Sequence, residues 1–218
     1  MTASALVFYF DYISPFAYLA SLRVEAIGAR LGKRVEATPV LFAGLLNHFG
    51  QLGPAEIEPK RRWAFRRALR RADQLGVKLL PPPYHPFNPL LALRVTQAAP
   101  EEQRWSVIGA LFGAAWGSGK GVEQESDIRE ALRGRDVDVD QLLHAASTGP
   151  VKGALRAATE RAIQLGVFGV PTCRLGAELY WGEDTLDDMV AEALAGGPQH
   201  DERLERWLSI GASARRQP

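Results

Sequence analysis

Residues 8–19 read Phe8-Tyr9-Phe10-Asp11-Tyr12-Ile13-Ser14-Pro15-Phe16-Ala17-Tyr18-Leu19 and predict a strand, a turn and the start of a helix. The strand, Leu6–Phe10, is a short apolar run of the kind that is buried on both faces of a sheet. Ser14 followed by Pro15 predicts the helix start, because Ser accepts bonds from free N–H groups and Pro suits the first helical position. The hydroxyl of Ser14 is therefore expected at a helix N-terminus.

The next elements complete a βαβ unit. Apolar residues at helical spacing continue to Gly32, which is a helix stop, and Val35–Leu41 predicts a second strand that ends near Pro39. A strand, a helix and a strand within about 40 residues predict parallel pairing of the two strands.

The middle of the chain has a different character. The clearest amphipathic helix is marked by Trp105, Ile108, Leu111, Phe112, Ala115 and Trp116. Further helix candidates are Arg61–Leu75 and Pro89–Ala99. The segment Leu80–Pro86 holds too many prolines for a helix or a central strand, so we expect an extended connection that fixes Tyr84 and His85 in place.

The C-terminal part predicts a helix, a hairpin and a last helix. These elements are Pro150–Leu165, Thr172–Leu175 joined through Gly176-Ala177 to Glu178–Trp181, and Asp184–Ala195. The whole order predicts an α/β protein with a thioredoxin-like fold and a large all-helical insertion. The expected thioredoxin-like domain is discontinuous, at 1–42 and 149–218, and the helical insertion domain covers 43–148.

Composition and charge exclude several classes of function. The chain has 218 residues, 46% of them hydrophobic, and a net charge of +1, which favours neither nucleic acid nor an anionic membrane as partner. Its single cysteine, Cys173, excludes an internal disulfide and a Cys-x-x-Cys redox pair, and we expect this thiol to be buried and inert. No run is long enough for a signal peptide or a membrane span, and nothing indicates a metal site. We expect a cytoplasmic enzyme.

Three separated motifs carry a resemblance to a known family. They are Phe10–Pro15, Gly166–Thr172, and Tyr180–Asp184 followed by Leu186-Asp187; Lys60–Trp63 and Pro86–Pro89 extend the match into the insertion. In these residues the chain resembles the 2-hydroxychromene-2-carboxylate isomerases, which are related to kappa-class glutathione transferases and more distantly to DsbA oxidoreductases. Ser14 and Ala17 stand where the two cysteines of a disulfide oxidoreductase belong.

The resemblance implies a glutathione-dependent isomerase of aromatic degradation that acts on a small aromatic carboxylate. In the implied mechanism the thiolate of glutathione adds beside the ring oxygen, the ring opens and a bond rotates. The thiol then leaves, giving a product of the trans-o-hydroxybenzylidenepyruvate type. Relatives imply a homodimer. Two alternatives stay open: a kappa-type transferase or peroxidase, and a non-catalytic thioredoxin-like module that holds peptides across the turn at Pro171.

Ser14 is the expected catalytic residue. A free thiol has a pKa of about 8.5, and a hydroxyl at a helix N-terminus favours its anion, so Ser14 is expected to hold the thiolate. A purely structural reading makes Ser14 a helix cap and nothing more. The resemblance further implies a cis bond before Pro171, with the backbone of Val170 pairing with the tripeptide as another strand would.

Other residues are expected around the ligand. The resemblance assigns the γ-glutamyl end to the turn of Trp181, Gly182, Glu183 and Asp184, and we expect Asp184 also to cap the last helix. Thr185 departs from the family, whose members often carry Arg there.

The basic run 60–71 predicts a solvated helix face, from which Lys60 and Trp63 are expected to meet an anionic group of the ligand. For the substrate we expect contacts from a cleft between the two lobes, with Asn47, Tyr84 and His85 as the candidates and with His48, Gln51 and Asn88 nearby.

Overall fold

The structure, a computed structural model, describes residues 5–197 and 201–214. Its centre is a four-stranded sheet in the order β2-β1-β3-β4. The strands are β1 (Leu6–Phe10), β2 (Val35–Pro39), β3 (Thr172–Leu175) and β4 (Glu178–Trp181). β1 and β2 are parallel, while β3 runs antiparallel to both β1 and β4. The predicted βαβ unit and hairpin are thus confirmed, and β2 ends at Pro39 as expected.

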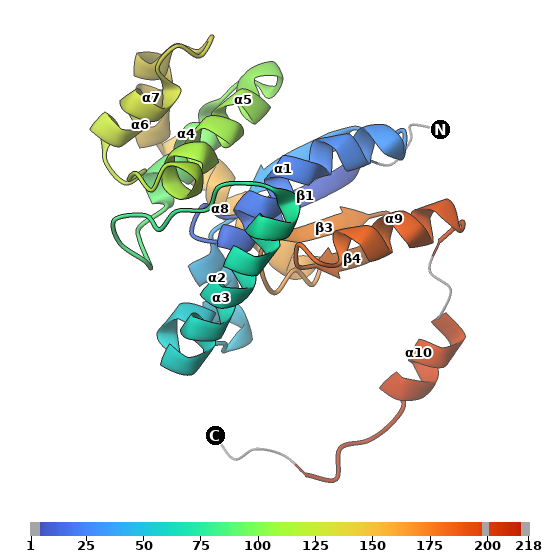
Figure 1. Cartoon of the computed structure of the whole chain (residues 1–218). Helices are drawn as coiled ribbons and strands as arrows, with labels where there is room; N and C mark the ends of the chain where they lie inside the picture. The colour runs from blue at the N-terminus through green and yellow to red at the C-terminus, as the bar shows by residue number, and fades with distance from the viewer. Residues whose placement is uncertain (1–4, 198–200, 215–218) are drawn as a thin grey trace.

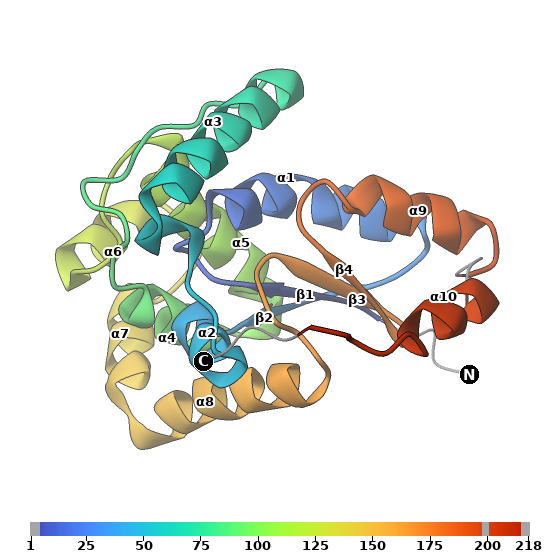
Figure 2. The same cartoon turned by 90° about the horizontal axis from the view of Figure 1, so that it is seen from below.

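Three helices cover the two faces of this sheet. They are α1 (Pro15–Arg30), α8 (Gly149–Gln164) and α9 (Leu186–Leu194). α1 and α9 lie on one face and α8 on the other (Figure 2). Alternating side chains of β1 serve both faces, with Phe8 and Phe10 in one apolar cluster and Val7 and Tyr9 in the other. The described residues therefore have the predicted thioredoxin-like architecture.

The segment between β2 and α8 is all-helical, as predicted. It contains α2 (Phe42–Phe49), a 3₁₀ turn (Pro54–Glu56), α3 (Glu58–Leu75), α4 (Leu90–Ala98), α5 (Glu101–Phe112), a π-helical turn (Gly113–Gly117), α6 (Glu125–Leu132) and α7 (Val139–Ser147). α4 to α7 gather beyond one end of the sheet, and α3 projects separately from the body (Figure 1). The apolar stripe from Trp105 to Trp116 is not one regular helix, because its last turn widens into the π-helical segment.

The insertion and the sheet share one hydrophobic core. Phe8 of β1 stacks with Trp105 of α5, with ring centroids 6.1 Å apart. Tyr12, just after β1, packs against Phe112 at 4.6 Å. One cluster of buried residues includes members of β1, α1, α4, α5, α6 and α7. The division into two domains stays a prediction, but the two parts do not have separate interiors.

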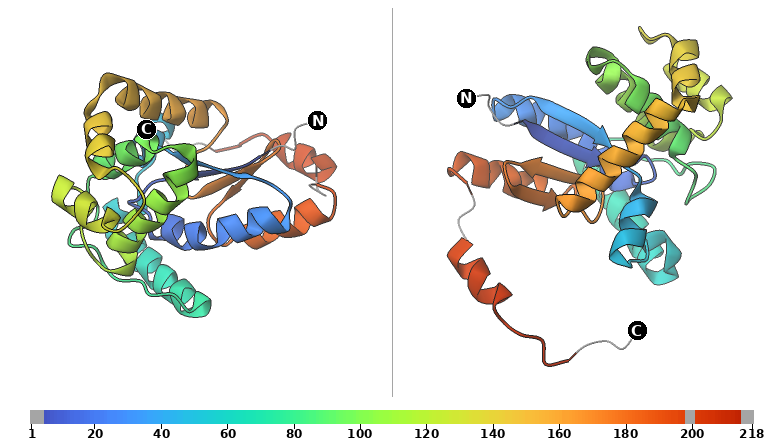
Figure 3. Two further views of the ribbon diagram at one scale, coloured as in Figure 1. Left: turned by 90° about the horizontal axis from the view of Figure 1, so that it is seen from above. Right: turned by 180° about the vertical axis from the view of Figure 1, so that it is seen from behind.

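Two features of the C-terminal region differ from expectation. The last predicted helix begins at Leu186 rather than at Asp184, and its N-cap position is Thr185. A further helix that was not predicted, α10 (Asp201–Leu208), follows it and lies away from the sheet (Figure 3). Among the described residues, no helix has the length and apolar character needed to cross a membrane.

Candidate functional site

Ser14 occupies the N-cap of α1, as the sequence predicts. Its Oγ accepts a hydrogen bond from the backbone N–H of Ala17 at 3.2 Å. The same Oγ lies 3.5 Å from the carbonyl oxygen of Val170, to which it donates a long bond. Ser14 retains 9% of its surface. Two of the expected site residues, 156 positions apart in the chain, are therefore in contact.

The turn before Ser14 contains a buried carboxyl that the sequence analysis missed. Asp11 is 1% exposed, and its carboxyl oxygens accept bonds from Ile13 N (3.1 Å) and from Phe42 N, the first residue of α2 (2.9 Å). Burial raises the pKa of Asp11 to about 7, against the opposing effect of these N–H groups. The sequence predicts a turn at Asp11. It does not predict that the carboxyl is buried, because the burial depends on α2, which is distant in sequence.

The loop before β3 contains Val170 and Pro171, where the family resemblance predicts a cis peptide bond. The peptide bond between Val170 and Pro171 is cis, which confirms the expectation. Thr172 Oγ1 donates to Gly169 O at 2.8 Å, and Gly182 N donates to Pro171 O at 2.9 Å. The N–H of Val170 has no hydrogen-bond partner among the described residues, although Val170 is 8% exposed. An unpaired backbone N–H is a donor that an external acceptor could use.

Trp181 closes one side of the same loop. Its indole packs edge-on against Phe168, with centroids 4.9 Å apart, and a Cβ on Gly169 would lie 2.5 Å from Trp181 Nε1. Gly169 is therefore required for this close approach. Trp181 as a whole is 53% exposed and lies at the edge of the candidate site.

Glu183 has a different environment from the one expected of a ligand-binding carboxylate. Its side chain is 1% exposed and accepts bonds from Arg23 Nη1 (2.5 Å), Arg71 Nε (2.7 Å) and Arg71 Nη2 (2.9 Å). Both guanidiniums come from helices, α1 and α3. Glu183 thus joins the insertion helix α3 to the turn after β4, and its carboxylate already has two cationic partners.

Asp184 is the more accessible acidic group of this turn. Its side chain is 56% exposed and accepts a bond from Arg67 Nη2 at 2.6 Å. The expectation that Asp184 caps α9 is wrong, because Thr185 holds the N-cap position. Thr185, which departs from the family pattern, donates its hydroxyl to Gly182 O at 3.1 Å. The turn is therefore held by its own residues, leaving Asp184 at the surface.

Lys60 and Trp63 lie on the face of α3 that leads to this turn. Residues 60, 63, 67 and 71 follow one another at spacings of three and four, so they form one stripe on a helix. The last two members, Arg67 and Arg71, contact Asp184 and Glu183. Trp63 is 64% exposed, and the guanidinium of Arg67 lies 5.8 Å from its ring. The stripe gives part of the basic run a structural role in addition to its solvated face.

The three candidate substrate residues are in different environments. Asn47 is exposed near the end of α2, and Tyr84 is 72% exposed in the proline-rich connection. His85 is half-buried, and its Nε2 donates to Ile13 O at 3.0 Å while its Nδ1 is buried without a partner. Nε2 is therefore already paired with the turn before Ser14, whereas Nδ1 has no partner among the described residues, and the expected substrate role of His85 stays a prediction.

Cys173 is buried in β3, as expected, at 1% exposure. Burial raises the pKa of its thiol to about 12, so the thiolate that chemistry requires is suppressed at neutral pH. The site therefore contains the Ser14 hydroxyl at the N-cap of α1 and has no accessible thiol among the described residues. Nor do these residues include a group of three or more His, Cys, Asp or Glu side chains that could hold a metal ion.

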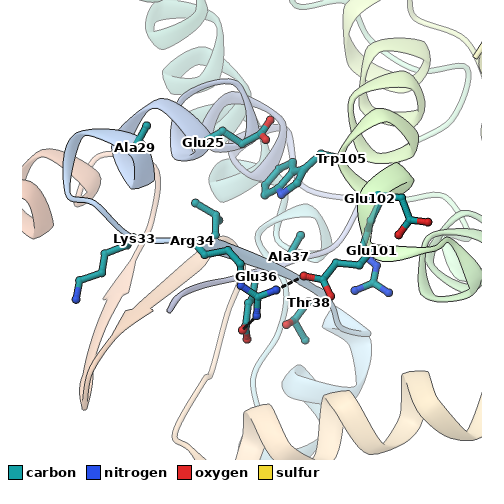
Figure 4. Close-up of a pocket in the computed structure, with 12 residues that line it drawn as sticks. Glu25, Ala29, Lys33, Arg34, Glu36, Ala37, Thr38, Glu101, Glu102 and Trp105 are labelled. Carbon is teal, nitrogen blue, oxygen red and sulfur yellow. Dashed lines mark hydrogen bonds and ion pairs between the residues drawn. The ribbon is translucent and has the colours of Figure 1, made fainter. Parts of the chain in front are cut away.

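A large hollow of about 830 Å³ lies elsewhere, beside the edge strand β2 (Figure 4). Its walls come from the C-terminal half of α1, from β2 and from the start of α5. Positive and negative side chains alternate around it, and the Arg34 guanidinium is already bonded to Glu36 and Glu101. None of the predicted site residues lines this hollow.

Comparison with known proteins adds three findings to this geometry. The sequence model of the DsbA-like thioredoxin domain family matches residues 5–195. A 2-hydroxychromene-2-carboxylate isomerase of Pseudomonas putida is 30% identical over 182 residues, which cover 82% of this chain and 89% of the relative. Glutathione S-transferase kappa 2 of Caenorhabditis elegans is 28% identical over 208 residues, covering 87% of this chain and 92% of the relative.

A solved structure agrees with the sequence relatives. The structure of a 2-hydroxychromene-2-carboxylate isomerase superposes with a TM-score of 0.77 at 26% identity, and the match covers 95% of this chain and 100% of that one. The fold and the N-cap site define a DsbA-like thioredoxin protein with a serine at the N-cap of its first helix. The chain belongs to the 2-hydroxychromene-2-carboxylate isomerase family within this DsbA-like class, next to the kappa-class glutathione transferases.

Proposed function

We propose that this protein is a glutathione-dependent cis-trans isomerase for substrates of the 2-hydroxychromene-2-carboxylate type. The observation that carries the proposal is the contact between Ser14 Oγ and the Val170 carbonyl, beside the unpaired N–H of Val170. A helix N-terminus, a hydroxyl and an unpaired strand-like backbone meet there. This combination suits a small peptide that carries a thiolate on a side chain.

The residues present fit glutathione. The unpaired Val170 N–H offers a donor to the backbone of the cysteinyl unit. Asp184 offers a carboxylate to the ammonium group of the γ-glutamyl unit. Its ion pair with Arg67 is exposed, so replacing Arg67 by the ligand ammonium costs little free energy. Lys60, on the same stripe of α3, offers a cation to a ligand carboxylate. The buried Glu183 holds the turn in place, and in this proposal it is a positioning group.

When bound, glutathione supplies a nucleophilic thiolate that adds to the substrate and later leaves, and this allows rotation about a bond that is otherwise double. Ser14 favours the anionic form of that thiol. The hydrogen bond from Ser14 Oγ to Val170 O is long and therefore weak. The hydroxyl can give up this bond and donate to a sulfur anion at little cost in free energy. Lowering a thiol pKa by two units requires about 2.7 kcal/mol, which a charge-assisted bond and a helix terminus together supply.

The proposal is tested with Ser14→Ala in an assay of a 2-hydroxychromene-2-carboxylate with and without glutathione. We expect turnover to require glutathione and to fall about 100-fold in the variant. Loss of the cap reduces the free energy of unfolding by only about 1 kcal/mol. The matched control is Ser21→Ala, because Ser21 lies in the same helix and its hydroxyl bonds, within the described part of the chain, to Tyr18 O alone.

Two results contradict the proposal. If turnover is equal in Ser14→Ala and Ser21→Ala, Ser14 acts only as a helix cap and has no role in catalysis. Absence of glutathione binding at millimolar concentration in calorimetry removes the enzymatic mechanism and favours the peptide-holding module.

A kappa-type transferase or peroxidase is the second candidate, favoured by the match to the kappa-class relative along 92% of its length. It would use the same Ser14 thiolate site with a different acceptor. A chlorinated nitroaromatic compared with the chromene carboxylate, each with glutathione, distinguishes the two activities. We further propose a homodimer in the cytoplasm, which light scattering on the purified protein and cell fractionation test.

A further inference from the structure

Two carbonyl groups just before Ser14 are held by side chains of the helical insertion. Trp116, in the π-helical turn after α5, donates from Nε1 to Tyr12 O at 2.8 Å. His85, in the proline-rich connection, donates from Nε2 to Ile13 O at 3.0 Å. The reactive turn of the thioredoxin-like part thus depends on contacts from segments 72 and 104 positions away.

The opposite ends of the same peptide groups are held by Asp11. The peptide group between Tyr12 and Ile13 has its carbonyl on Trp116 and its N–H on Asp11 Oδ1 at 3.1 Å. The next group has its carbonyl on His85, while its N–H, that of Ser14, donates to Asp11 O at 3.2 Å. Because a peptide group is planar, bonds at both ends fix its orientation. Two successive planes leading into Ser14 are therefore held at both ends.

The ring of His85 is itself well held. Arg61 of α3 donates to the backbone carbonyl of His85 at 3.0 Å. The ring packs edge-on against Phe65 and Trp116, with centroids 5.0 Å and 5.6 Å away. Since a carbonyl only accepts, Nε2 carries the hydrogen. The donor is thus set in one direction, toward Ile13 O.

We propose that His85 is a positioning residue for the isomerase site, which sets the direction of the Ser14 hydroxyl by holding the Ile13–Ser14 peptide plane. The inference rests on the proposed function and deepens it, because it makes the insertion responsible for the geometry of the thiolate site. Trp116 holds the preceding plane in the same way. Loss of the His85 donor allows the plane to rotate and weakens the alignment of Ser14 Oγ with the ligand sulfur.

The test compares His85→Leu, which removes the donor at similar volume, with His85→Gln, whose amide Nε2–H restores a donor. Phe87→Leu is the matched control, because Phe87 packs near both His85 and Trp116 (6.3 and 6.4 Å between centroids) and makes no bond to the turn. The first readout needs no ligand: hydrogen exchange at the amides of Ile13 and Ser14. We expect exchange about tenfold faster in His85→Leu only, as for one lost hydrogen bond.

The second readout is the pKa of bound glutathione, titrated by thiolate absorbance in the binary complex. We expect it about one unit higher in His85→Leu, matching a tenfold loss of thiolate, and close to the wild-type value in His85→Gln and Phe87→Leu. A thiol pKa that is unchanged in His85→Leu overturns the positioning role, even where exchange is faster. A pKa that rises equally in Phe87→Leu also overturns it, because packing alone then accounts for the effect.

Failure of the proposed isomerase function can be distinguished from failure of the positioning role of His85. If wild-type protein binds no glutathione, the proposed isomerase falls and His85 loses its role in catalysis. The difference in exchange between His85→Leu and Phe87→Leu then still reports whether the histidine holds the turn.

Discussion

Asp11 shows how much one buried carboxyl changes the chemistry of a turn. It accepts N–H groups from its own turn and from α2, and it has no cation among its hydrogen-bond partners in the described residues. Backbone donors compensate only part of the desolvation of a carboxylate. The residue therefore organises the approach to Ser14 and carries a protonation equilibrium near neutral pH.

This equilibrium predicts a pH dependence of stability. Burial raises the pKa of Asp11 in the folded state from 3.8 to about 7, so the folded protein binds this proton more tightly than the unfolded chain. The stabilising contribution is complete below about pH 4 and is lost as the pH rises to about 7, by up to about 4 kcal/mol. Urea unfolding of wild type and Asp11→Asn at several pH values measures it.

The difference between the two free energies of unfolding should change by up to about 4 kcal/mol across this range, because only the wild type loses the contribution. A difference between the two proteins that is constant from pH 4 to pH 7 would contradict the assignment.

At the scale of the element, α3 is the link between insertion and site. Its stripe of basic residues contacts the turn after β4 through Arg67 and Arg71, while Arg61 reaches the connection that carries His85. Helix α3 projects from the body (Figure 1), and these polar contacts add to the packing of Phe65, Ala72 and Leu75 against the core. The arginines on this helix face form ion pairs and hydrogen bonds within the protein, and binding of nucleic acid is not needed to explain them.

The carboxylate of Glu183 is the centre of this link, and its removal should be costly. Glu183→Gln leaves Arg23 and Arg71 close together without a buried anion, and we expect the free energy of unfolding to fall by about 3 kcal/mol. Asp187→Asn is the control, because Asp187 bonds to the same Arg23 but is 68% exposed; we expect a change within about 0.5 kcal/mol. Urea denaturation measures both, and equal stability of the two variants would refute the central role of Glu183.

At the scale of the whole molecule, we expect the sheet and the helical insertion to unfold together. Their aromatic side chains belong to one buried cluster, in which Phe8, Tyr12 and Phe112 lie. A shared interior favours a single cooperative transition over separate melting of two lobes. The thiol of Cys173, on a central strand of the sheet, is a natural probe of that transition.

Cys173 should react with a disulfide reagent only through global unfolding. The side chain is 1% exposed, and burial raises its pKa to about 12, so neither access nor thiolate is available in the folded state. We expect negligible reaction with DTNB in native buffer and one thiol per chain in strong denaturant, with the rate following unfolding measured by tryptophan fluorescence. Stoichiometric reaction of the native protein within seconds would show that β3 is accessible.

Much of the fold could be predicted because its signals are local. The Ser14-Pro15 helix start, the apolar run of β1, the hairpin of β3 and β4 and the helical character of 43–148 each depend on neighbours in the chain. The short helices α2, α6 and α7 were not identified individually, since eight or nine residues give little periodicity. Asp184 was misplaced as a cap because an acidic residue near a helix start has several possible partners, and here Arg67 is one of them.

From its order of residues alone, the chain determined a serine at the head of the first helix, a backbone loop opposite it and a family of relatives. Only the tertiary structure decided which groups surround them: the buried Asp11, the paired Glu183, and His85 turned toward the Ile13 carbonyl. The reason is physical. Helix starts and strands are set by interactions over a few residues, whereas burial, ion pairing and hydrogen bonding between distant segments depend on how the packed core brings those segments together.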